Sequence, residues 1–92
     1  MHHIILRKRS CLAIARITEQ TAEKWGNAKS TELTLIFQSA LLTISESPLI
    51  GRRIKINNVF VLTLSKVPFV IVYQVTKDTV QIITVLHTKR NR

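Results

Sequence analysis

The sequence predicts a single α+β domain over residues 1–92, in which a helical hairpin packs on one face of a small, mostly antiparallel curved sheet. A chain of 92 residues has room for only one hydrophobic core. Its apolar residues recur at helical spacing before Pro48 and at the spacing of strands after it. With a short apolar segment at the start, these two regions give the order β-α-α-β-β-β.

The first strand and the first helix follow one another closely. Residues 2–6 form a short segment rich in β-branched side chains, which predicts a strand. A helix is predicted from Leu12 to Trp25, a stretch without Gly or Pro, and Ser10 is its candidate N-cap. The residues predicted to face the core are Ile14, Ile17, Thr21 and Trp25.

The second helix begins after a turn of very few residues. Gly26 ends the first helix, as a glycine after a helix often does, and Asn27 is a candidate cap of the next. Pro48 stops the second helix. A connection this short requires an antiparallel helical hairpin. The apolar face of the second helix comprises Leu33, Ile36, Phe37, Ala40, Leu41 and Ile44.

Three strands are predicted in the second half of the chain, with 54–56 as a candidate short strand before them. Val59–Leu64 is rich in β-branched residues, and Phe69–Val75 is nearly continuously apolar, which indicates a central strand buried on both faces. The last strand, Thr79–Leu86, alternates, with Val80 and Val85 on opposite faces. Strands joined by such short turns must be antiparallel.

The charge of the chain indicates a polyanionic partner. Lys and Arg number 14 against 5 Asp and Glu, which gives a net charge of +9 and favours nucleic acid or an acidic protein segment. The single cysteine, Cys11, cannot form an internal disulfide, and with three histidines it argues against a structural zinc site, so no metal or cofactor is expected. The apolar runs are far too short to span a membrane, and we expect a cytoplasmic protein.

Four short motifs resemble those of one protein family. Val67–Val75 and Asp78–Arg90 resemble the pattern P-[YF]-x-I-x-Y-x-V, an acidic turn and I-x-x-V-L-H-x-x-R that ends ParE toxins. Lys24-Trp25-Gly26 resembles the W-G pair that ends their first helix. Ser47–Arg52 resembles their P-x-x-G-R segment. The motifs occur in order over nearly the whole chain, which is therefore similar to the RelE/ParE toxin superfamily.

The resemblance implies the toxin of a bacterial type II toxin–antitoxin pair with the fold predicted above. Its implied partner is a ParD-like antitoxin, whose acidic segment would wrap the toxin in a hetero-oligomer. Such charge complementarity would mainly speed association and fix the register. The antitoxin-binding residues are not predicted by the sequence.

Members of this superfamily act on two different targets. ParE relatives inhibit DNA gyrase, whereas RelE and YoeB relatives cleave messenger RNA on the ribosome. A ribonuclease needs cations at the phosphate, a base and a donor to the leaving oxygen. The candidate bases are His87 and Glu46, but Thr88 and Lys89 follow His87 where those nucleases carry a tyrosine. The gyrase hypothesis, which requires no catalytic residue, is therefore the leading one, and the ribonuclease is the alternative.

Basic residues are the candidate target-binding residues. Arg52 and Arg53 are expected near the same sheet edge as the basic C-terminal residues, although as neighbours in a strand they should point to opposite faces. Tyr73 and Trp25 are expected in the core. A nucleic-acid-binding module without toxicity ranks last, because aromatic residues make up only 5% of the chain. The predicted target-binding set is Arg52, Arg53, Lys66, His87, Lys89, Arg90 and Arg92.

Overall fold

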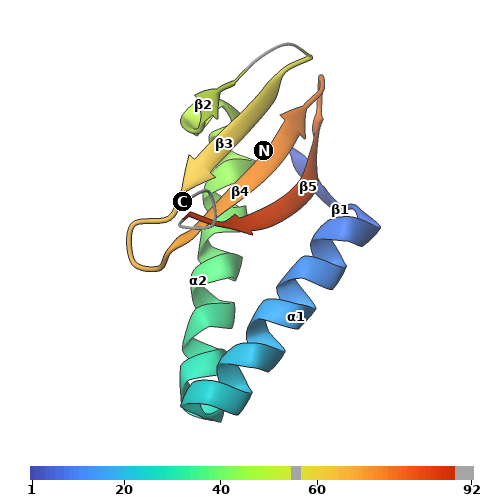
Figure 1. Ribbon diagram of the computed structural model, residues 1–92. Coiled ribbons are helices and arrows are strands. Elements are labelled where there is room, and N and C mark those ends of the chain that lie inside the picture. The colour runs from blue at the N-terminus through green and yellow to red at the C-terminus, as the bar shows by residue number, and fades with distance from the viewer. Residues whose placement is uncertain (55–56, 89–92) are drawn as a thin grey trace.

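Two antiparallel helices cover one face of a five-stranded sheet in the computed structural model, which describes residues 1–54 and 57–88 (Figure 1). The fold class and the order of elements predicted from the sequence are confirmed. The elements are β1 (His3–Leu6), α1 (Lys8–Trp25), α2 (Asn27–Glu46), the 3-10 turn η1 (Pro48–Ile50), β2 (Arg52–Arg53), β3 (Val59–Thr63), β4 (Phe69–Val75) and β5 (Thr79–His87).

The strands lie in the order β1-β5-β4-β3-β2. From β2 to β5, each strand is antiparallel to its neighbour in the sheet, as the short turns require. Strand β1 pairs in parallel with the first half of β5. Ile54 lies outside a strand, and the rest of the candidate strand at 54–56 lies outside the described residues. The short edge strand is formed instead by Arg52 and Arg53.

Both predicted helix caps are wrong. Helix α1 begins at Lys8, directly after β1, because the Arg7 amide still donates to the Ile82 carbonyl of the sheet. Ser10 is therefore inside the first turn, fully buried, and its hydroxyl donates to the Arg7 carbonyl at 2.7 Å. Gly26, at φ 96°, is the only residue between the helices, so Asn27 is already helical and caps nothing.

The core lies between α2 and the sheet. Phe37 meets Phe69 edge to face at 5.9 Å between ring centroids, and Phe60 stacks on Tyr73 at 5.6 Å. Ile14 and Ile17 of α1 pack against this cluster. The buried apolar residues are Leu33, Phe37, Ala40, Ile44, Phe60, Ile71, Tyr73, Val80, Ile82 and Val85.

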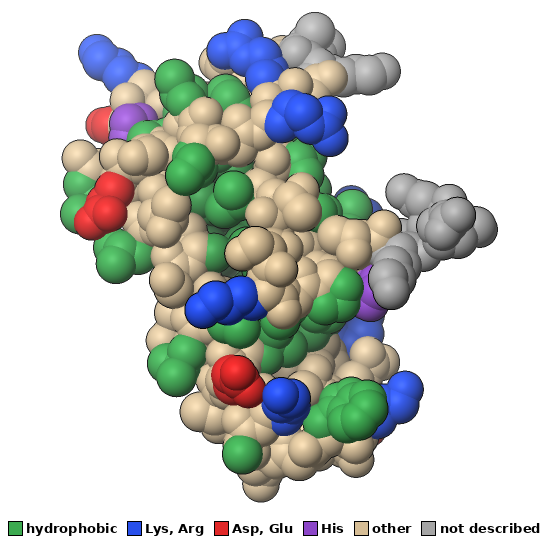
Figure 2. All heavy atoms as spheres, turned by 90° about the vertical axis from the view of Figure 1, so that its left-hand side faces the viewer, with side chains coloured by type: hydrophobic (Ala, Val, Ile, Leu, Met, Phe, Trp, Pro, Cys, Tyr) green, Lys and Arg blue, Asp and Glu red, His purple; other side chains and the backbone are tan. Residues whose placement is uncertain are grey.

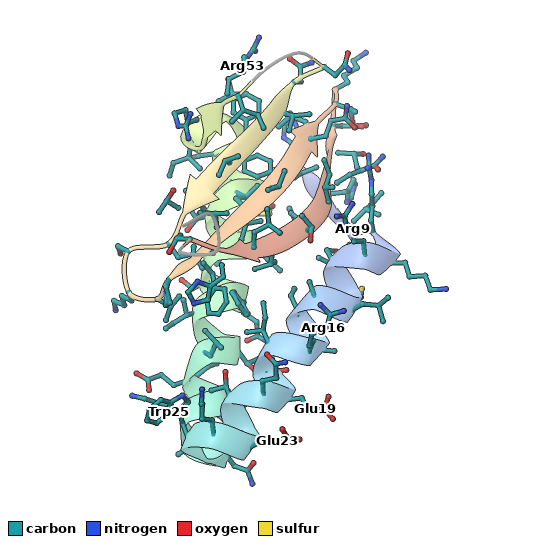
Figure 3. The ribbon with its side chains drawn as sticks, in the orientation of Figure 1. Arg9, Arg16, Glu19, Glu23, Trp25 and Arg53 are labelled. Carbon is teal, nitrogen blue, oxygen red and sulfur yellow. The ribbon has the colours of Figure 1, made fainter. Side chains whose placement is uncertain are left out.

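Trp25 is not in the core, contrary to prediction. Its side chain is 68% exposed, because it ends α1 at the tip of the hairpin, which projects beyond the sheet (Figures 1 and 3). The W-G motif therefore marks the hairpin turn, and the aromatic side chain is left on the surface.

A bulge in β5 changes which side chains face the helices. Val72 pairs with Thr84 while Tyr73 pairs with Ile82, so Ile83 is an extra residue. The predicted alternation is wrong beyond this point, and Val85 is buried in the core. Strand β4 is central in the sheet, as predicted. Both helices cover the same face of the sheet, so the face of β4 that points away from them is only partly buried.

The hydroxyl of Tyr73 connects the sheet to the turn after α2. It donates to the Pro48 carbonyl at 2.8 Å and accepts from the Gly51 amide at 2.9 Å. The prediction that Tyr73 lies in the core is confirmed, and its hydroxyl has two hydrogen-bond partners. The P-x-x-G-R motif thus has a structural role, since it holds the chain that leads into Arg52 and Arg53.

Stability should fall in alkali because of this tyrosine. Burial raises the pKa of Tyr73, and the hydrogen bond from Gly51 lowers it only in part. The folded state therefore retains its proton above about pH 10, where the unfolded state loses it. We expect stability to be unaffected by this group below about pH 10 and to decrease above it, by at most about 1.4 kcal/mol per pH unit. Urea denaturation between pH 8 and 11 measures the slope.

Tyr73→Phe is the matched variant for this measurement, because the chain has no other tyrosine. The variant should be less stable at pH 8 but should lack this part of the alkaline decrease. Equal slopes in the two proteins would contradict the assignment to Tyr73.

Candidate functional site

A groove of about 1080 Å³ runs between α1 and the C-terminal half of β5. We call it the α1 groove. Its floor is apolar, with Ala13 and Ile17 of α1 facing Phe69 and Val85 of the sheet. Leu12, 55% exposed, and the exposed Trp25 stand at its rim. The groove thus offers apolar contact area that no described residue covers.

The charged residues of the groove come mainly from α1. Arg9, Arg16 and Lys24 line it, together with one carboxylate, Glu23. Along α1, Arg9 and Arg16 are followed by Glu19 and Glu23 towards the tip that carries Trp25 (Figure 3). These cations are not among the target-binding residues predicted from the sequence. The signal was available, since Arg9, Leu12 and Arg16 lie three and four residues apart and so share one helix face.

The edge of β5 inside the α1 groove is free of a partner strand in the described part of the chain. Strand β1 pairs only with residues 79–82. The Thr88 amide donates to the Pro68 carbonyl. In an antiparallel pair of strands every second residue forms hydrogen bonds with the partner strand, so the backbone groups of Leu86 and Thr84 also point to β4. The N–H and C=O of Val85 therefore point into the groove.

His87 lies at the mouth of this groove, at the end of β5. Its exposed ring meets Phe69 edge to face at 5.1 Å. Lys66 lies at the same end of the sheet, in the β3–β4 turn two residues before Pro68. The structure thus brings together two of the predicted target-binding residues, while Lys89, Arg90 and Arg92 lie outside the described residues.

Arg52 and Arg53 do not share a sheet edge with His87, and the basic residues after it, to which the prediction also refers, lie outside the described residues. Arg52 and Arg53 form the edge strand β2, which is separated from β5 by β3 and β4 and hence by about 14 Å across the sheet. As predicted, the two point to opposite faces: Arg52 pairs with Val61, whereas Arg53 pairs with Phe60 and holds its guanidinium 5.5 Å from that ring.

The two candidate bases of a ribonuclease are far apart. Glu46 ends α2 beside β1, since the Ser45 carbonyl accepts from the His2 amide. Strand β1 in turn pairs with the start of β5, and His87 ends the same strand. Eight residues of strand separate these ends, which is about 26 Å. The hydroxyl of Tyr73 is buried and already forms hydrogen bonds with Pro48 and Gly51.

Neither a metal cluster nor a membrane helix is found in the part of the chain that the structure describes. Among residues 1–54 and 57–88, no three His, Cys, Asp or Glu side chains come together in a way that could hold an ion. Over the same residues, no helix is long and apolar enough to cross a bilayer.

The fold is that of bacterial toxins. A chain from the chromosomal ParDE toxin–antitoxin system of P. aeruginosa superimposes with a TM-score of 0.85 at 16% identity, covering 97% of this chain and 98% of that one. The isolated RelE toxin of E. coli gives a TM-score of 0.67 at 20% identity, covering 98% and 87%. The intact RelBE toxin–antitoxin complex of E. coli gives 0.67 at 20% identity, covering 98% and 100%.

Residues 4–92 match the family described as the ParE toxin of type II toxin–antitoxin systems, parDE. The chain therefore belongs to the ParE toxin family. No curated protein sequence matches it significantly. A toxin of this class is one half of a two-component system, so an antitoxin partner follows from membership of the family.

Proposed function

We propose that this toxin inhibits DNA gyrase and that a ParD-like antitoxin neutralises it by occupying the α1 groove. The observation that carries the choice of target is the position of Tyr73, the one tyrosine of the chain, because its hydroxyl is buried between Pro48 and Gly51 and cannot act as a leaving-group donor beside His87. A cleavage mechanism needs a base and a leaving-group donor around one phosphate, whereas a gyrase inhibitor needs only a binding surface. The end of the sheet with His87 and Lys66 supplies a basic surface of that kind.

The α1 groove fits an acidic, amphipathic segment. Its apolar floor would take the apolar side chains of such a segment, and Arg9 and Arg16 would face its carboxylates. The exposed Trp25 is the type of residue that dominates binding energies at interfaces. Because His87 also lines the groove, an occupant would cover part of the target-binding surface.

Ribosome-dependent cleavage of messenger RNA is the second candidate function. It is favoured by the position of His87, an exposed imidazole at the end of the sheet that also carries Lys66. A supercoiling assay with purified gyrase decides between the two, with the product of the adjoining antitoxin gene added in a second series. Inhibition relieved by the antitoxin supports the proposal. A folded toxin that leaves gyrase unaffected but cleaves messenger RNA on ribosomes, and loses cleavage in His87→Ala, overturns it.

Charge reversal at the C-terminus should abolish most of the activity. The double variant Lys89→Glu with Arg90→Glu lowers the net charge from +9 to +5. We expect the concentration for half-inhibition of gyrase to rise about tenfold or more. We expect the melting temperature to stay nearly constant, and a large decrease would show that these two residues pack into the fold.

The matched control reverses two cations away from this end, Lys8→Glu with Lys77→Glu, and leads to the same net charge. Both side chains are exposed, one in the first turn of α1 and one in the β4–β5 turn. An equal loss of inhibition in the two double variants would show that overall charge, and not the C-terminal surface, matters.

Charge reversal in the α1 groove should weaken the binding of the antitoxin. For Arg9→Glu with Arg16→Glu, we expect the Kd for the antitoxin to rise about 100-fold, with slower association as part of the effect, because charges that attract an acidic segment become repulsive. Calorimetry measures this Kd, and Lys8→Glu with Lys77→Glu is again the control. Unchanged affinity would place the antitoxin on another surface.

A further inference from the structure

Arg7 places a charged side chain on the face of the sheet that the helices leave open. In Figure 1 the sheet lies in front of α2, so this open face is turned towards the reader. Tyr73 and Ile82 are buried in the core, and their strand neighbours Gln74 and Gln81 therefore point to the other face. The two glutamines pair directly across β4 and β5, and both accept hydrogen bonds from the Arg7 guanidinium.

The guanidinium of Arg7 is fixed along one edge of its plane. Its Nε donates to Gln81 Oε1 at 2.7 Å, and its Nη2 donates to Gln74 Oε1 at 3.0 Å. Gln74 is held in turn, because its side-chain amide donates to the Asn57 carbonyl at 2.9 Å. The second N–H of Nη2 and the neighbouring N–H of Nη1 point along the adjacent edge, and neither has a partner among the described residues. We call these two donors the Arg7 fork.

The positive charge of Arg7 is not neutralised within the described part of the chain. Both of its partners are neutral amides, and the ion pair found among residues 1–54 and 57–88 joins Lys29 to Glu32. The first turn of α1, which follows Arg7 directly, contains no acidic residue. A guanidinium that is already held in one geometry loses little side-chain entropy on binding, so the Arg7 fork is prepared for bidentate contact with an anionic group.

The surface around the Arg7 fork is apolar and carries no aromatic ring. Val61 and Val72 pair across β3 and β4 on the open face and are partly exposed, and Ile5 of β1, on the same face, is 48% exposed. The aromatic rings of the sheet lie on the helical face instead, as the stack of Phe60 on Tyr73 shows. Nucleic-acid interfaces are more polar and more positively charged, and often use stacking rings. A protein surface with apolar side chains therefore fits the open face better.

The charge at the other edge of the open face is also positive. Arg52 pairs with Val61 and so points to this face from β2. Figure 2 looks onto that edge of the molecule, where Lys and Arg side chains gather at the end that carries β2 and the visible Asp and Glu side chains lie apart from them. An acidic protein surface is therefore attracted to the open face. A second copy of this chain would bring a further charge of +9, which opposes self-association.

We propose that the open face of the sheet is a docking surface for gyrase, on which the Arg7 fork receives a carboxylate of the gyrase protein. This inference rests on the proposed function and names a group that the target must carry. Val61 and Val72 would pack against apolar side chains next to that carboxylate. Six residues of β5 separate Gln81 from His87, which is about 20 Å, so a large target can contact both the Arg7 fork and the basic end of the sheet.

Gln81→Glu tests the Arg7 fork without removing it. The new carboxylate keeps the acceptor for Arg7 Nε and neutralises the guanidinium, and the amide N–H groups that are lost have no partner among the described residues. Gln38→Glu, on the exposed side of α2, is the matched control with the same change of charge. We expect the Kd of the toxin for intact gyrase, measured by biolayer interferometry at constant salt, to rise at least tenfold for Gln81→Glu and less than twofold for Gln38→Glu.

Two further measurements show whether Gln81→Glu acts only at the open face. Its melting temperature should not fall, because the carboxylate pairs with Arg7. Its Kd for the adjoining-gene antitoxin should change less than twofold, because Gln81 does not line the α1 groove. An equal loss of affinity for gyrase and for the antitoxin would overturn the assignment of the open face to gyrase.

Arg7→Lys separates the geometry of the Arg7 fork from its charge. Lysine keeps the positive charge but cannot present two parallel donors to one carboxylate. We expect the Kd for intact gyrase to rise at least fivefold, with circular dichroism showing that the variant is folded. Wild-type affinity in Arg7→Lys would overturn the bidentate contact.

The outcomes separate this inference from the proposed function. If gyrase binds the wild type, Gln81→Glu and Arg7→Lys equally, the docking surface is overturned and the gyrase target is left intact. If gyrase does not bind the wild type at all, both are overturned. Linear duplex DNA alone is titrated in parallel. DNA binding that is lost in Gln81→Glu, with unchanged affinity for DNA-free gyrase, would assign the Arg7 fork to a phosphate and overturn the protein carboxylate.

Discussion

Replacing Gly51 by alanine is expected to lower the free energy of unfolding by about 3 kcal/mol. A Cβ at this position would lie 2.7 Å from the Tyr73 hydroxyl oxygen and 2.9 Å from the Val61 carbonyl oxygen. Neither neighbour can move freely, since the hydroxyl bridges two backbone groups and the carbonyl belongs to β3. The substitution would therefore displace η1 and the start of β2. Urea denaturation measures the loss.

Gly26→Ala is the matched control for this prediction. Gly26 has a positive φ of 96°, but a Cβ there would meet no atom within 4 Å. Only backbone strain remains, which should cost about 1–3 kcal/mol, because φ 96° with ψ 166° is a combination that glycine alone adopts readily. A larger loss of stability in Gly26→Ala than in Gly51→Ala would show that the contact between Gly51 and Tyr73 is not what fixes the turn.

Ile71→Ala should lower the free energy of unfolding by about 2–5 kcal/mol. Ile71 is only 1% exposed, in the strand at the centre of the sheet, and the rigid packing of β3 and β5 on either side prevents collapse of the cavity. For a domain of 92 residues, such a loss approaches the whole free energy of unfolding. Circular dichroism during thermal denaturation measures it.

The neighbouring residue provides the control for Ile71→Ala. Val72 lies in the same strand but on the face that the helices do not cover, and it is partly exposed. Val72→Ala should cost about 1 kcal/mol or less. Equal losses for the two variants would mean that the open face of the sheet is packed as tightly as the helical face.

The architecture was predictable because it depends on local periodicity. The change of period at Pro48 separates helices from strands, and the short turns fix antiparallel pairing for every strand but the first. The partner of β1 was not predictable, since a strand of four residues carries no signal for the neighbour that it will join. The bulge at Ile83 was not predicted either, because one extra residue reverses the alternation of side chains without changing the composition of the strand.

The candidate site was predicted only in part. His87 and Lys66 do lie at one end of the sheet, which the tight β3–β4 turn brings about. The assignment of Arg52 and Arg53 to that end failed because it depends on the order of strands, which is decided by tertiary packing. Trp25 was misplaced for a related reason: its spacing fits the buried face of α1, but the sheet does not extend far enough to cover it.

The parallel pairing of β1 with β5 determines when this toxin can first exist in its finished form during synthesis. His3 pairs with Thr79, so the earliest strand to leave the ribosome must wait for the last one. The helical hairpin, built from contacts close in sequence, can form while the rest of the chain is still being made. The sheet is completed only with β5, the strand that also carries His87. During each round of translation there is therefore an interval in which the helices are formed while the sheet, and with it the end that carries His87, is still incomplete.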